Sequence, residues 1–68
     1  MLFRYAKRLA NRDEVTLKET GEVGYVLGEP VVHPAVIRRG QKRVPPYVEI
    51  PAQFPSAGFT HVTHLEVD

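Results

Sequence analysis

The stretch Asp13-Glu-Val-Thr-Leu-Lys-Glu-Thr-Gly-Glu-Val-Gly-Tyr-Val-Leu-Gly28 decides the fold of this chain, because it has the pattern of two strands joined by a turn. Apolar Val15 and Leu17 alternate with polar residues, which is typical of a strand with one buried face. Gly21 predicts the turn, since glycine adopts the positive φ that a tight reversal needs. Gly24 interrupts the second strand, and glycine within a strand marks a bulge or a close backbone approach. We therefore expect a small, strongly curved sheet.

The sequence does not decide which residues of that second strand face inward. A bulge at Gly24 would shift the side-chain phase by one residue. Either Val23 and Tyr25 or Gly24 and Val26 therefore point into the core.

Prolines and glycines divide the rest of the chain into further short strands. Residues 31–37 are rich in β-branched side chains, and residues 39–41 predict a turn that joins 36–38 to 42–44 as a short hairpin. Residues 47–50 form a clear strand, which we expect to end at Pro51 because proline has no N–H to donate. Residues 59–67 read as the last strand, with Phe59, His61, Thr63, Leu65 and Val67 on one face.

The N-terminal segment has the spacing of an amphipathic helix. Leu2, Phe3, Ala6 and Leu9 form one apolar stripe, so we expect a short helix over residues 1–11 that docks on the sheet through this stripe. Docking on a partner is the alternative, and a strand preceding Val15 is a second one.

The turn and second strand resemble a known family. Gly21-Glu-Val-Gly24-Tyr-Val26 resembles the motif of KOW-type domains, although Arg12 stands where related barrels often have glycine. Residues 47–50 and 63–66 are similar to the closing strands of SH3-like barrels. The resemblance implies an SH3-like small β-barrel, a fold that hosts many functions, and KOW modules contact RNA or protein partners.

We therefore expect one domain over residues 1–68, all-β, folded as a small SH3-like barrel of four to five strands with a short N-terminal helix. Closing the sheet would also remove exposed strand edges. The predicted core consists of Val15, Leu17, Val26, Val48, Ile50 and Leu65.

Composition excludes several classes of protein. The chain has no cysteine, so it holds no disulfide and no thiolate metal site, and we expect a cytoplasmic location. No apolar run is long enough to span a membrane, so we expect no membrane partner. The net charge is only +1, but it is unevenly distributed: residues 1–12 and 33–43 each carry +4, while residues 13–32 carry −4 and residues 44–68 carry −3. Solvated, mutually compensating charges would explain this pattern, and so would a binding face.

The basic hairpin tip is the main candidate binding site. Arg38, Arg39, Lys42 and Arg43 are expected to contact phosphates, and Tyr47 would stack on a base of RNA or single-stranded DNA, with Tyr25 as a further stacking surface. The alternative is that the four cations only keep a short sheet edge soluble.

A second hypothesis is a protein–protein or assembly module that uses the helix and residues 31–37, acting as a homo-oligomer. We expect no enzyme activity, no catalytic residues, no cofactor and no metal site. His61 and His64 lie three apart on a strand and therefore point to opposite faces. Tyr25, Phe54 and Phe59 are expected to be core or corner residues rather than ligand contacts.

Overall fold

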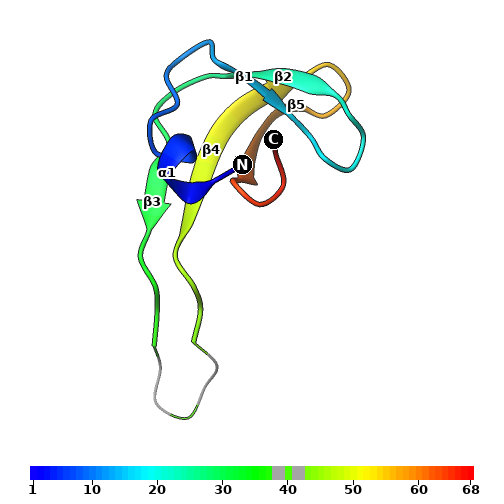
Figure 1. Ribbon diagram of the computed structural model, residues 1–68. Coiled ribbons are helices and arrows are strands. Elements are labelled where there is room, and N and C mark those ends of the chain that lie inside the picture. Colours follow the sequence, from blue (N-terminus) through cyan, green and yellow to red (C-terminus); the bar gives the residue numbers. More distant parts are fainter. Residues whose placement is uncertain (38–39, 41–42) are drawn as a thin grey trace.

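The computed structural model describes residues 1–37, 40 and 43–68, which form a curled antiparallel sheet with one very short helix (Figure 1). The elements in chain order are α1 (Phe3–Ala6), β1 (Glu14–Thr16), β2 (Val23–Val26), β3 (Val31–His33), β4 (Tyr47–Phe54) and β5 (Gly58–Thr63). The expected fold class, a mostly β chain with a short N-terminal helix, is confirmed. Within the described ranges, none of the helical structure is long and apolar enough to cross a membrane.

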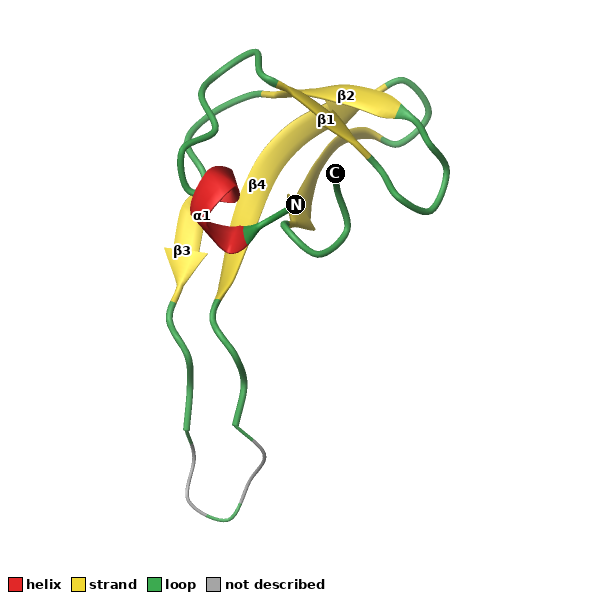
Figure 2. Cartoon of the chain, in the orientation of Figure 1, coloured by secondary structure: helices red, strands yellow, loops and turns green. Residues whose placement is uncertain are grey.

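Strand β4 organises the sheet, because β2, β3 and β5 all pair with it. Strand β5 runs along one side of β4. On the other side, β3 pairs with the first part of β4 and β2 pairs with the last part. Strand β1 extends the sheet beyond β2. The five strands curl into half a barrel, and α1 lies against its concave side (Figure 2).

The core lies on the concave side and follows from the alternation of β4. Val48, Ile50, Ala52 and Phe54 are buried, whereas the residues between them face outward. Four of the six predicted core residues are fully buried, and they are Val15, Val26, Val48 and Ile50. The cluster also contains five residues outside those six, and they are Ala6, Ala52, Phe54, Val62 and Val67.

Gly24 settles the phase of β2, because only glycine fits where it lies. A Cβ atom at Gly24 would come within 2.5 Å of the Gln53 carbonyl oxygen and of the Phe54 ring. Gly24 and Val26 therefore face inward, and Val23 and Tyr25 face outward. Gly21, at the preceding turn, has a φ of 74°, as the turn prediction requires.

The prediction that Pro51 ends its strand is wrong, since Pro51 lies in the middle of β4. In an antiparallel ladder the N–H and C=O of one residue point to the same neighbour. The Pro51 carbonyl accepts a hydrogen bond from Leu27 N–H, so its missing N–H faces that side as well. There the pairing with β3 has ended at Glu49 and the pairing with β2 begins only at Ala52. The missing donor therefore falls in a gap of the ladder.

The prediction of one continuous strand over residues 59–67 is also wrong. Strand β5 ends at Thr63, and a turn follows in which Thr63 N–H donates to Glu66 Oε1. Leu65 has the outward phase of exposed Phe59 and His61 and is 65% exposed rather than a core residue, whereas the turn brings Val67 into the core. Leu17, the remaining member of the predicted core, is only partly buried and bridges to Val67.

The N-terminal helix is shorter than predicted. Only Phe3–Ala6 is helical, and the chain then reverses so that Arg12 N–H can donate to the Val26 carbonyl at 2.7 Å. Because the chain must reverse before this hydrogen bond, a helix cannot extend over residues 1–11. Ala6 is buried and Leu9 packs against the core, but Leu2 is exposed, so the predicted docking stripe is formed only in part.

Both ends of the chain meet near buried His64 (Figure 1). The amino group of Met1 donates to the carbonyls of His64 and Val67. Burial, reinforced by the positive charges of the N-terminal ammonium and Lys18, lowers the pKa of His64. The neutral ring can therefore accept a hydrogen bond at Nδ1 from Val48 N–H, at 3.2 Å.

Candidate functional site

Residues 34–37 and 43–46 continue from β3 and β4 as the two sides of an arm, which projects away from the half-barrel (Figure 2). Val36 and Val44 hold its two sides together, because each N–H donates to the carbonyl of the other at 2.9 and 2.8 Å. The predicted pairing of 36–38 with 42–44 is thus confirmed in its described part. The arm makes the molecule elongated, with principal extents of 41 × 22 × 18 Å.

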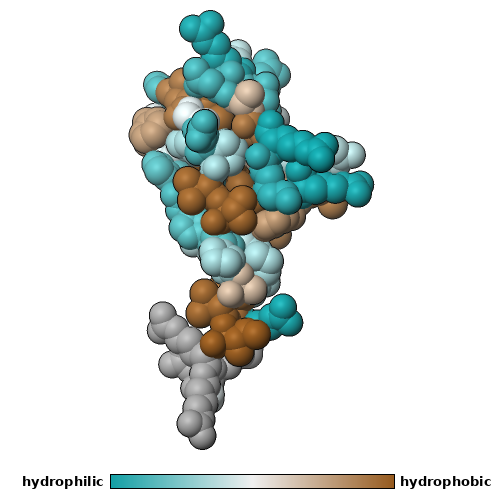
Figure 3. Space-filling view, turned by 90° about the vertical axis from the view of Figure 1, so that its left-hand side faces the viewer, coloured by the Kyte–Doolittle hydropathy of each residue, from teal (hydrophilic) through white to brown (hydrophobic). Residues whose placement is uncertain are grey.

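The described part of the arm exposes apolar side chains. Ile37 is 74% exposed, and Val36 and Val44 are also exposed. Apolar surface is visible along this part of the arm in the space-filling view (Figure 3). Val31 and Val32 at its base are each about half exposed. Among the described residues these side chains stay exposed, because the arm extends beyond the core.

The predicted nucleic-acid contacts are only partly described by the structure. Arg38, Arg39 and Lys42 lie outside the described residues. Arg43 is exposed on the arm. Tyr47, at the base of the arm, is half-buried and stacks on the His33 ring, with a centroid distance of 4.5 Å and an interplanar angle of 7°. One face of the Tyr47 ring is therefore already occupied within the chain.

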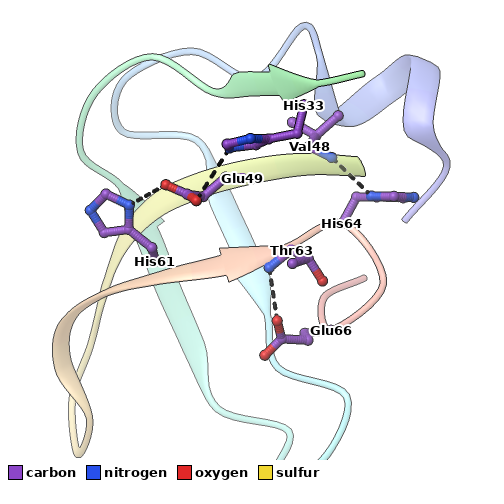
Figure 4. A network of polar contacts seen from close by, with 7 residues as sticks. All are labelled: His33, Val48, Glu49, His61, Thr63, His64 and Glu66. Carbon is purple, nitrogen blue, oxygen red and sulfur yellow. Dashed lines mark hydrogen bonds and ion pairs between the residues drawn. The ribbon is translucent and has the colours of Figure 1, made fainter. Parts of the chain in front are cut away.

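A group of polar side chains lies just beyond Tyr47, on the outward face of the same strand. Glu49 sits between two imidazoles, from His33 on β3 and His61 on β5 (Figure 4). Glu49 Oε2 is 2.7 Å from His61 Nδ1, within hydrogen-bond distance. Glu49 Oε1 is 3.3 Å from His33 Nε2. The His33 nitrogen is buried, and this contact does not have the geometry of a hydrogen bond. The three side chains tie β3, β4 and β5 together at the root of the arm.

The strand register explains this group, which the sequence analysis missed. His33 lies opposite Tyr47 and His61 lies opposite Pro51, so both are diagonal neighbours of Glu49 on the same face. Diagonal neighbours in a sheet come within reach of long side chains. Spacing along the chain gives no such signal, because the pairing of β3 and β5 with β4 must be known first. The prediction that His61 and His64 face opposite ways is confirmed, as His61 is exposed and His64 is buried.

Replacing His61 with alanine should raise the pKa of Glu49. The hydrogen bond from His61, with the charges of His61 and His33, lowers that pKa below its usual value of 4.5. A lowered folded-state pKa means that the unfolded state binds more protons in acid. The stability from Glu49 is therefore present above pH 4.5 and is lost as the pH falls through the folded-state value. Carbon chemical shifts of the Glu49 carboxyl, followed during an acid titration, measure this pKa.

The matched control for that titration is Thr63→Ala, because Thr63 lies directly opposite Glu49 and leaves both imidazoles in place. An equal rise of the Glu49 pKa in both variants, or no rise in either, would contradict the role given to His61.

A row of exposed side chains crosses the convex side of the sheet, which we call the outer face. Tyr25 lies opposite Gln53, and Gln53 lies opposite Phe59. Tyr25 is 51% exposed and Phe59 is 57% exposed, so neither is a core residue, while Phe54 is buried as predicted. The Phe59 ring meets His61 edge-on at 5.5 Å. The row is therefore continuous with the group around Glu49.

Within residues 1–37, 40 and 43–68 there is no group of three or more His, Cys, Asp or Glu side chains arranged to hold a metal ion. The site thus consists of an apolar arm, a polar root and an aromatic row on the outer face. No family model matches the chain, and neither the curated proteins nor the solved structures include a match.

Proposed function

We propose that this chain is a non-catalytic interaction module that self-associates through its arm. The observation that carries the proposal is the exposure of Ile37, Val36 and Val44 on an arm that projects from the half-barrel. Large apolar patches are rarely left exposed by soluble monomers, and grouped exposed apolar side chains mark sites of protein interaction. Partner binding would also stabilise a domain of this size, whose own core is small.

The chemistry of the described side chains supports a binding role rather than catalysis. Ser56 is the only serine of the chain. Its hydroxyl donates to Glu22 Oε2 at 2.6 Å, and its backbone N–H donates to Glu22 Oε1. This pair joins the turn before β2 to the turn before β5. Ser56 is thus held as a structural cross-link between two turns.

Replacing Ile37 with serine should weaken self-association by about ten- to a hundredfold, because burying an isoleucine contributes about 1.5–3 kcal/mol. Leu65→Ser is the matched control, since Leu65 is an aliphatic side chain away from the arm that is 65% exposed, against 74% for Ile37. Sedimentation velocity over a range of concentrations measures both variants and the parent. The proposal fails if Ile37→Ser associates as the parent does, or if both variants weaken association equally.

Nucleic-acid binding is the second candidate, favoured by the four cations in residues 38–43 and by the exposed position of Arg43. A labelled single-stranded oligonucleotide, titrated at low and moderate salt, tests it. Affinity that falls steeply with salt, and that disappears when the four cations are replaced by alanine, would support phosphate contacts. We place it second because the outward-facing residues near the arm include the carboxylate of Glu49, which repels phosphates.

For the fold family we propose an SH3-like barrel of the KOW type. The segment that resembles the KOW motif, residues 21–26, covers the end of the connection between β1 and β2 and the whole of β2. This position is the one that the resemblance implies, and it supports the assignment.

A further inference from the structure

We propose that the arm of one copy docks on the outer face of a second copy, across the row formed by Tyr25, Gln53 and Phe59. The inference rests on the proposed self-association and names the surface that receives the arm. Two independent properties of the molecule carry it: complementary charge, and the direction in which the arm points.

The outer face is acidic and aromatic. The residues of the five strands that point outward include two carboxylates, Glu14 and Glu49, and no lysine or arginine. Glu14 lies opposite Tyr25, so a carboxylate stands at one end of the aromatic row. Glu49 stands beyond its other end, reached through His61. Such a surface attracts cationic and apolar groups, since cations also bind the faces of aromatic rings.

The arm has the opposite character. Between Glu29 and Glu49 the sequence contains four cations and no acidic residue. The described apolar side chains of the arm, led by Ile37, are exposed. A basic, apolar segment and an acidic, aromatic face therefore exist in the same molecule, and their charges are complementary.

The arm cannot reach the outer-face row of its own copy. It leaves the sheet at Tyr47, whereas Gln53 lies six residues further along β4. At about 3.3 Å per residue the row is roughly 20 Å from the root of the arm. The arm projects in the opposite direction, away from the half-barrel (Figure 1). An arm that docks on this face therefore belongs to a second molecule.

Such a contact joins two different surfaces, whereas arm-to-arm packing would join a surface to itself. This difference makes the proposal testable by mixing. Ile37→Ser impairs the arm and leaves the face intact. The double variant Tyr25→Ser/Phe59→Ser impairs the face and leaves the arm intact. Both substitutions of the double variant are at exposed positions, so the core is unchanged.

We expect each variant alone to associate at least about tenfold more weakly than the parent. An equimolar mixture should form a heterodimer, because one copy supplies an intact arm and the other an intact face. Tyr5→Ser, at an exposed aromatic residue on α1, is the control and should behave as the parent. Sedimentation velocity with one variant fluorescently labelled reports the heterodimer directly.

The other outcomes are distinct. If the face variant associates as the parent does while Ile37→Ser does not, the arms pack on each other; this overturns the docking inference and leaves the proposed function standing. A mixture that remains monomeric also overturns the inference. A parent that is monomeric at all concentrations overturns the proposed function together with the inference.

Discussion

Replacing Ile50 with alanine is expected to lower the free energy of unfolding by about 2–5 kcal/mol. Ile50 is fully buried at the centre of β4, where it packs in the core on the concave side of the sheet. Alanine would remove three buried carbon atoms and leave a cavity that the surrounding strands cannot fill. Because small domains are only marginally stable, this loss approaches or exceeds the total stability of the chain. Urea denaturation followed by circular dichroism measures the effect.

The control for Ile50 is Leu65→Ala, an aliphatic side chain of the same size that is 65% exposed. Substitutions at such positions change stability by no more than about 0.5 kcal/mol. The pair distinguishes the observed core from the one that the strand pattern predicts, in which both residues are buried. Equal destabilisation by the two variants would show that the described phase of residues 58–67 is incorrect.

Replacing Gly24 with alanine should have the second large effect, although it adds only one methyl group. The new Cβ would lie 2.5 Å from both the Gln53 carbonyl oxygen and the Phe54 ring, closer than atoms in a folded protein pack. Overpacking of this kind costs about 1–3 kcal/mol, and here the backbone of β4 would have to move as well. Alanine also reduces the entropy of the unfolded chain, but that gain is below about 1 kcal/mol.

Thermal unfolding compares this variant with Val23→Ala, a neighbouring substitution on the outward side of β2. We expect a lower melting temperature for Gly24→Ala and a small change for Val23→Ala. A Gly24→Ala variant as stable as the parent would mean that β2 and β4 do not approach as closely as described.

The sequence predicts most of the strands because their alternation is local. Val15, Val26, Val48 and Ile50 stand in alternating patterns, and all four are buried. Gly21 and Gly24 were predicted to mark a turn and a close approach, and both do so. In each case the physical cause lies within a few residues of the signal.

The errors occur where tertiary pairing decides the outcome. Pro51 is tolerated within β4 because the ladder has a gap at that position, and the gap depends on where β2 and β3 pair. Leu65 is exposed because the buried phase of this segment is that of Val62 and His64, and the pairing of β5 with β4 sets that phase. A strand pattern in one segment contains no information about either event.

The candidate site was predictable in part for the same reason. The hairpin and its basic residues are visible in the sequence, and the bridge between Val36 and Val44 confirms the pairing. The group of His33, Glu49 and His61 was not predictable, since its members are brought together by the register of three strands. The exposure of Tyr25 and Phe59 likewise depends on the phase that Gly24 imposes and on the register of β5.

The central claim is that the exposed arm makes this chain self-associate, and sedimentation equilibrium of the parent chain tests it most directly. The account predicts an average mass that starts near the 7.7 kDa of one chain and rises with concentration to at least twice that value. A mass that stays at one chain throughout, up to concentrations of about a millimolar, would correspond to an association weaker than about 4 kcal/mol and would contradict the claim.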